Sequence, residues 1–128
     1  MALTDKKCVP CEGAVQPFTE AQIKEYLAEL KTEWQVIDGK KIQKKFKFKD
    51  FKDAVAFVNK VAELAEKEGH HPDIRIFGWN NVEIELFTHA ISGLSENDFI
   101  LASRLKGYDE PYSNYEKVVG TGREDFDW

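Results

Sequence analysis

The sequence has no long run of apolar residues, and this absence excludes a membrane-spanning helix. Apolar residues make up 42% of the 128 residues, but they come in short runs, whereas a helix that crosses a bilayer needs roughly 20 in succession. The first seven residues, Met1 to Lys7, hold no apolar core of the kind that a secretory signal contains. We therefore expect a soluble protein of the cytoplasm, with the nucleus as the alternative location, and no membrane partner.

The chain also has no surplus of basic residues. Its formal net charge is −5, of which −4 falls in residues 108–128 and only −1 on the rest of the chain. Proteins that bind nucleic acid through its phosphates need an excess of lysine and arginine, so we do not expect a nucleic acid partner. The seven lysines in residues 40–52 are a local exception, which we interpret as a solvated strand face that discourages pairing between sheet edges.

Cysteine is scarce, and the two cysteines present, Cys8 and Cys11, stand together in a Cys-Val-Pro-Cys motif. A structural zinc site takes four protein ligands, and the sequence has no second cysteine pair to complete one. A thioredoxin-like redox pair follows a strand and opens a helix, which this segment is not expected to do. We interpret it as two reduced cysteines in an N-terminal arm, residues 1–18.

Cap signals divide the chain into three helices. Thr19 and Gln22 form a capping box, and apolar residues at helical spacing follow it. Gly69 is placed as the C-cap of a second helix, whose long apolar stripe indicates a central position. Asp98, three residues after Ser95, predicts the start of a third helix. The expected helices span residues 20–31, 51–68 and 96–106.

Two pairs of strands lie between these helices. Asp38-Gly39 is a hairpin turn signal, and Asn80-Asn81 is the expected turn of the second hairpin. Alternation puts the apolar residues of each strand on one face of the sheet and the polar residues on the other. This parity places Trp79 and His89 together on the face that the helices leave open. The expected strands span residues 34–37, 41–49, 74–79 and 82–89.

The order of elements, α-β-β-α-β-β-α, is typical of an α+β fold. We expect two layers, in which a four-stranded antiparallel sheet carries all three helices on one face. Residues 19–107 form this domain, between the arm of residues 1–18 and an acidic, aromatic C-terminal extension of residues 108–128. The second face of the sheet is then open to solvent, to a substrate or to another subunit.

All three histidines fall within 20 residues, and the expected topology brings them to one end of the second hairpin. His70 and His71 stand at the start of its first strand, and His89 at the end of its second. Zinc prefers tetrahedral nitrogen or sulfur ligands, but adjacent histidines in an extended segment point to opposite sides. Acid–base catalysis needs only one imidazole to donate a proton and another to accept one, so we prefer it to a metal site.

Seven residues at fixed spacing carry a resemblance to a known family. They are Glu66, His70, His71, Pro72, Trp79, His89 and Asp98. With this pattern the chain resembles the pterin-4a-carbinolamine dehydratases over roughly residues 8–107. These proteins are also called dimerisation cofactors of a homeodomain transcription factor. The family fold has three helices on one side of a four-stranded antiparallel sheet, which agrees with the order of elements above.

The resemblance implies a hydro-lyase that needs no metal and no organic cofactor. Family members remove the hydroxyl of 4a-hydroxytetrahydrobiopterin as water and yield quinonoid dihydropterin, in the recycling of tetrahydrobiopterin. By motif position, His70 and His89 are the acid–base pair, in either order, and His71 binds or orients the pterin. Trp79 stacks on the flat pterin ring or belongs to a subunit contact.

The two acidic residues of the motif have alternative interpretations. Glu66 contacts the pterin, tunes His70, or is a solvated acid on the outside of its helix. Asp98 occupies the capping-box position of the last helix, so we leave it outside the catalytic set.

The resemblance also implies partners. Family members form dimers and tetramers, so we expect a homodimer or homotetramer here. The alternative function is that of a protein-interaction module, a dimerisation cofactor of a transcription factor, which needs no intact histidines. A third interpretation is a related role in pterin or molybdopterin metabolism.

Overall fold

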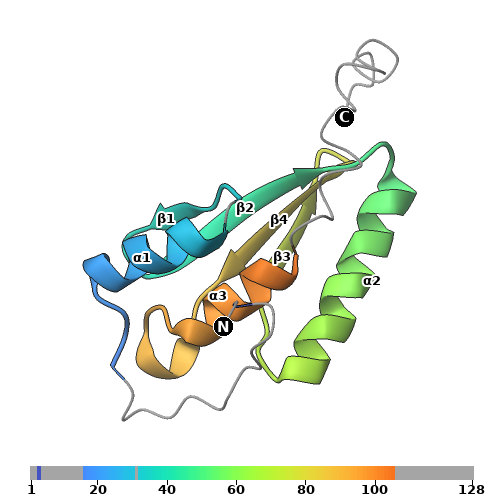
Figure 1. Ribbon diagram of the computed structural model, residues 1–128. Helices are drawn as coiled ribbons and strands as arrows, with labels where there is room; N and C mark the ends of the chain where they lie inside the picture. The colour runs from blue at the N-terminus through green and yellow to red at the C-terminus, as the bar shows by residue number, and fades with distance from the viewer. Residues whose placement is uncertain (1–2, 4–15, 31, 106–128) are drawn as a thin grey trace.

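The computed structural model describes residue 3 and residues 16–30 and 32–105 of the chain (Figure 1). Its elements are α1 (Glu20–Leu30), β1 (Gln35–Ile37), β2 (Lys41–Lys47), α2 (Phe51–Glu68), β3 (Asp73–Phe77), β4 (Asn81–Leu86), the 3-10 helix η2 (His89–Ile91) and α3 (Glu96–Arg104). The cysteine motif, the expected helix stop at Gly107 and the C-terminal extension lie outside the described residues. Within these residues, no helix has the length and apolar character needed to cross a membrane.

The four strands form one antiparallel sheet in the order β1-β2-β4-β3. β2 pairs with β4 so that Phe46 lies opposite Val82, and β4 pairs with β3 so that Ile84 lies opposite Ile74. The three helices lie on the same side of this sheet, with α2 along β3 and β4, and with α1 next to α3 (Figure 1). The predicted α+β fold and its order of elements are confirmed.

Aromatic side chains fill the layer between helices and sheet. Phe57 of α2 contacts the rings of Phe46 and Phe48, with centroids 4.7 and 4.9 Å apart. The ring centroids of Phe99 of α3 and Tyr26 of α1 are 5.3 Å apart. Burying one such side chain contributes roughly 1.5–3 kcal/mol to folding. These contacts therefore hold α2 on the sheet and α1 against α3.

Both ends of α2 follow the predicted cap signals. Asp50 Oδ1 accepts the backbone N–H of Asp53 at 2.8 Å at the start of the helix. At its end Gly69 has a φ of 68° and donates its N–H to the carbonyl oxygen of Ala65 at 2.8 Å. Glycine adopts this left-handed conformation at little cost. The chain therefore leaves α2 in a fixed direction just before His70.

The turn of the second hairpin differs from the prediction of Asn80-Asn81. Gly78 and Trp79 occupy its central positions, with φ values of 54° and 51°. Asn80 is buried, and its side-chain amide donates to the carbonyl oxygen of Phe48 at 2.9 Å. The carbonyl of Asn80 accepts the N–H of Phe48 at 2.8 Å. This tie to the end of β2 holds Asn80 as the last residue of the turn, before Asn81 begins β4, and Trp79 adopts a conformation unusual for a bulky residue.

The strands are shorter than the sequence predicted, and the earlier turn is part of the reason. β3 ends at Phe77 rather than at residue 79, and β4 ends at Leu86 rather than at residue 89. β2 ends at Lys47 rather than at residue 49, and α3 ends at Arg104 rather than at residue 106. The consequence for the site is that His89 lies in η2, outside the sheet.

Gly93 packs against the segment that leads into α1. A Cβ atom at position 93 would lie 2.6 Å from Cβ of Pro17, and Phe18 anchors this segment by donating its N–H to the carbonyl oxygen of Leu94 at 2.8 Å. Gly93→Ala should lower the free energy of unfolding in urea by roughly 1–3 kcal/mol, the usual cost of overpacking. In a Pro17→Gly background the colliding atom is absent, so the added cost should fall. Equal costs in both backgrounds would contradict the contact.

Candidate functional site

The three histidines lie at one end of the hairpin of β3 and β4. His70 and His71 come just before Asp73, the first residue of β3, and Asp73 pairs with Glu85 near the end of β4. His89 follows β4 in η2. The end of α2, the start of β3 and the connection from β4 to α3 therefore all contribute titratable side chains to this region.

His70 is held by a buried carboxylate. Its Nε2 lies 2.6 Å from Oδ1 of Asp98, which stands 28 positions further along the chain in the first turn of α3. The side chain of Asp98 has no exposed surface and that of His70 is 11% exposed, so water competes little for this contact. A short contact between imidazole and carboxylate fixes the orientation of the ring. Nδ1 of His70 is then the ring nitrogen that Asp98 does not contact.

Asp98 receives hydrogen bonds on its second oxygen as well. Oδ2 accepts the backbone N–H of Ser95 at 2.9 Å and the hydroxyl of Thr88 at 2.9 Å. The Ser95 contact belongs to the capping box of α3, so the predicted cap is confirmed. The same carboxylate therefore caps α3 and holds His70, a link that the sequence does not predict.

Glu66 pairs with His71 rather than with His70. Its Oε2 lies 2.6 Å from Nε2 of His71, and the two side chains are 76% and 62% exposed. Water screens such a pair, so its contribution to stability is small. The carboxylate in contact with His70 is the buried Asp98 of α3 rather than Glu66, and tuning of His70 by Glu66 stays a prediction. Contact of Glu66 or His71 with a substrate stays a prediction.

His89 is exposed and lies against an aromatic ring. The ring centroids of His89 and Phe87 are 3.9 Å apart, with 47° between the ring planes. The ammonium group of Lys41 lies 4.8 Å from the centroid of Phe87 and 3.5 Å from a carboxylate oxygen of Glu85. Phe87, directly after β4, therefore packs against the imidazole of His89.

Trp79 lies at the opposite end of the hairpin. The turn that contains it is separated from the histidines by the five residues of β3, at roughly 3.3 Å each. The predicted shared sheet face of Trp79 and His89 is wrong, because neither residue belongs to a strand. This placement does not support stacking of Trp79 on a pterin held by the histidines of the same chain. Its alternative role in a subunit contact stays a prediction.

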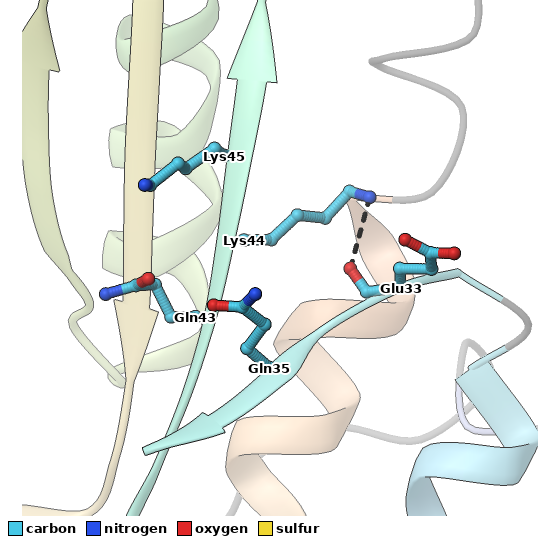
Figure 2. Close-up of a pocket in the computed structure, with 5 residues that line it drawn as sticks. All are labelled: Glu33, Gln35, Gln43, Lys44 and Lys45. Carbon is cyan, nitrogen blue, oxygen red and sulfur yellow. Dashed lines mark hydrogen bonds between the residues drawn. The ribbon is translucent and has the colours of Figure 1, made fainter.

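A polar hollow on β1 and β2 contains none of the histidines. Its volume is about 190 Å³, and its lining comprises Glu33, Gln35, Gln43, Lys44 and Lys45 (Figure 2). In Figure 2 Lys44 points toward Glu33 and donates to its backbone oxygen at 3.3 Å, whereas Lys45 points away across β4. Because the charged groups do not converge, we assign no ligand to this hollow. Across the described part of the chain, no group of three or more His, Cys, Asp and Glu side chains is arranged to hold a metal ion.

Comparison with known proteins identifies the family. The family model described as pterin 4 alpha carbinolamine dehydratase matches residues 16–108, which is most of the chain. The protein therefore belongs to this family, and the resemblance inferred from the sequence motif is confirmed.

Bacterial relatives are similar over nearly their whole length. A protein of Alkaliphilus metalliredigens is 47% identical over 80% of this chain and 92% of its own, and one of Rickettsia canadensis is 48% identical over 81% and 94%. Both bear pterin-4-alpha-carbinolamine dehydratase as a provisional name. Their names thus agree with the family assignment.

Two solved structures share the fold. The transcriptional coactivator/pterin dehydratase of Brucella melitensis superimposes with a TM-score of 0.67 at 36% identity, covering 73% of this chain and 99% of that one. A pterin dehydratase-like protein described as a RuBisCO assembly factor in the alpha-carboxysome has a TM-score of 0.51 at 25% identity, covering 63% and 94%. The fold thus occurs in proteins described by more than one role.

Three residues support the histidines in a way that the sequence does not predict. The spacing of Asp98 and Ser95 predicts only a helix cap, and nothing in the sequence predicts a role for Thr88. The position of Asp98 in the family motif could have indicated a role at the site, but its position three residues after Ser95 is explained equally well by a helix cap. For Thr88 the only signal in the sequence is its position next to His89. No spacing pattern predicts that its hydroxyl contacts the start of α3.

Asp98→Asn and Glu66→Gln each remove a carboxylate that contacts a histidine, but in different surroundings. Asp98→Asn should lower the free energy of unfolding by about 1–3 kcal/mol, because buried donors lose a charged acceptor. Glu66→Gln, at an exposed site, should stay within about 0.5 kcal/mol of the parent. Urea unfolding followed by circular dichroism measures both. Equal losses in the two variants would contradict the buried supporting role of Asp98.

Proposed function

We propose that this protein dehydrates a pterin-4a-carbinolamine, with His70 and His89 as the acid–base pair. The observation that supports this most is that His70, oriented by the buried Asp98, lies at the same end of the hairpin as His89. Family membership supplies the substrate class. We infer 4a-hydroxytetrahydrobiopterin as the substrate and the recycling of tetrahydrobiopterin as the context.

The reaction needs two proton transfers and no change of oxidation state. One imidazole donates a proton to the 4a-oxygen as the C4a–O bond breaks, and water leaves. The other imidazole accepts the proton of N5, whose electron pair forms the new C4a=N5 bond of quinonoid dihydropterin. Exchange with solvent returns both imidazoles to their starting forms. Imidazole suits both steps because it gains and loses protons near neutral pH.

His71 and Glu66 are our candidates for polar contacts to the substrate. They lie beside His70 in sequence and in space, and both are exposed. The pyrimidine part of a pterin carries hydrogen-bond donors and acceptors, which a histidine and a carboxylate can meet. We assign His71 to substrate binding rather than to proton transfer because of its position in the family motif, and we assign Glu66 with it because the two side chains contact each other.

A protein-interaction role is the second candidate function. The Brucella relative is described as a transcriptional coactivator as well as a pterin dehydratase, and the carboxysome relative as an assembly factor. A groove between α1 and the β1–β2 hairpin, lined by Ile23, Leu27 and Val36 among others, offers an apolar surface for such a role. Such a role would tolerate loss of the histidines, whereas the dehydratase would not.

Variants of the two catalytic candidates test the proposed reaction. His70→Ala and His89→Ala should each lower kcat for carbinolamine dehydration by roughly 10²–10⁴-fold, the usual contribution of a general acid or base. Stopped-flow absorbance measures the reaction, and circular dichroism checks the fold. Lys60→Ala, on the exposed side of α2, is the control and should behave as the parent. Near-normal turnover in both histidine variants would remove them from the mechanism.

We also propose that the protein forms a homodimer or homotetramer. β3 is an edge strand, and no described strand pairs with its outer side. Phe51, at the start of α2, is 55% exposed, so a neighbouring subunit would have both an edge and an apolar side chain to cover. Light scattering should give a twofold or fourfold multiple of the chain mass of 14.7 kDa. A single-chain mass at micromolar concentration would contradict this proposal.

A further inference from the structure

Thr88 is a buried polar residue directly before His89. Only 4% of its surface is exposed, and it lies between the last residue of β4 and the start of η2. Its hydroxyl lies 2.8 Å from the hydroxyl of Ser95 and 2.9 Å from Oδ2 of Asp98. The side chain is therefore tied to the first turn of α3, which also holds His70.

The backbone of Thr88 closes the loop that carries His89. Its N–H donates to the carbonyl oxygen of Gly93 at 2.8 Å, and the N–H of Gly93 donates back at 3.4 Å. Inside the loop, Ile91 donates its N–H to the carbonyl of Thr88, and Ser92 donates to that of His89, both at 3.2 Å. The shape of the loop is thus set internally, and Thr88 lies at its fixed end.

Counting protons gives the direction of the hydrogen bonds. A threonine hydroxyl has one proton to donate, and Asp98, as a carboxylate, can only accept it. Ser95 must then donate its own hydroxyl proton to Thr88. The network runs from Ser95 through Thr88 to Oδ2 of Asp98, while Oδ1 of the same carboxylate contacts Nε2 of His70.

We propose that Thr88 is a positioning residue, whose hydroxyl fixes the loop of His89 relative to His70 through their shared support, Asp98. Its catalytic consequence rests on the proposed function, since dehydration needs two imidazoles at a set separation. Losing the hydroxyl would leave both histidines present but free to shift, and misplacement by about 1 Å can cost roughly 10²-fold in rate. No substrate contact of Thr88 is involved.

Thr88→Val and Thr88→Ser form the matched test. Valine keeps the branched shape but cannot donate to Asp98, whereas serine keeps the hydroxyl. Thr88→Val should lower kcat roughly 10- to 100-fold and leave KM within about twofold of the parent. Thr88→Ser should keep kcat within about threefold of the parent. Ser103→Ala is the control, because it removes a buried hydroxyl of α3 that is bonded to the carbonyl oxygen of Ile100 at 2.6 Å rather than to Asp98.

A second readout separates this inference from the proposed function. In protein with labelled histidines, Thr88→Val should shift the imidazole NMR resonances of both His70 and His89 and leave those of His71 in place. This holds whether or not the protein turns over a carbinolamine, so an inactive parent would refute the function alone. Unshifted resonances of His70 and His89, or an unchanged kcat in an active protein, would overturn the positioning role. If Thr88→Val does not fold, Thr88→Cys, with only a weak S–H donor, carries the same test.

Discussion

The buried carboxylate of Asp98 is the group on which the arrangement of the site depends. It caps α3 through Ser95, receives the hydroxyl of Thr88 and contacts the imidazole of His70. A buried carboxylate is costly unless hydrogen bonds compensate for lost hydration, and here three groups converge on it. The same contacts that make its burial tolerable connect α3 to the end of α2 and to the connection after β4. Stability and the placement of the histidines therefore depend on one side chain.

Two pairs of a histidine and a carboxylate lie in the site, one buried and one exposed. His70 and Asp98 are shielded from water, so their geometry is fixed before any substrate arrives. His71 and Glu66 are exposed, and water can compete for their contact. In the proposed reaction this division is useful, because proton transfer needs fixed distances, whereas recognition of a polar ring tolerates adjustment. Burial, rather than residue type, distinguishes the two imidazoles.

Most of the fold was predictable because its signals are local. The capping boxes at Thr19 and Ser95 join groups three residues apart, and Asp38-Gly39 adopts the positive φ values its turn requires. The predictions failed where contacts between residues far apart in the sequence determine the local structure. The turn falls on Gly78, Trp79 and Asn80 rather than on Asn80-Asn81, with Asn80 held by the backbone of Phe48, and this shift undid the parity argument for Trp79. The contact of His70 with Asp98 spans 28 positions, and no periodicity reports it.

The most direct test of the account is where a pterin binds. A stable analogue such as 7,8-dihydrobiopterin can be titrated into protein with labelled histidines while the imidazole resonances are followed by NMR. The account predicts saturable shifts of His70, His71 and His89 that fit one dissociation constant. Saturable binding that leaves all three imidazoles unshifted would contradict it, because the ligand would then occupy another surface.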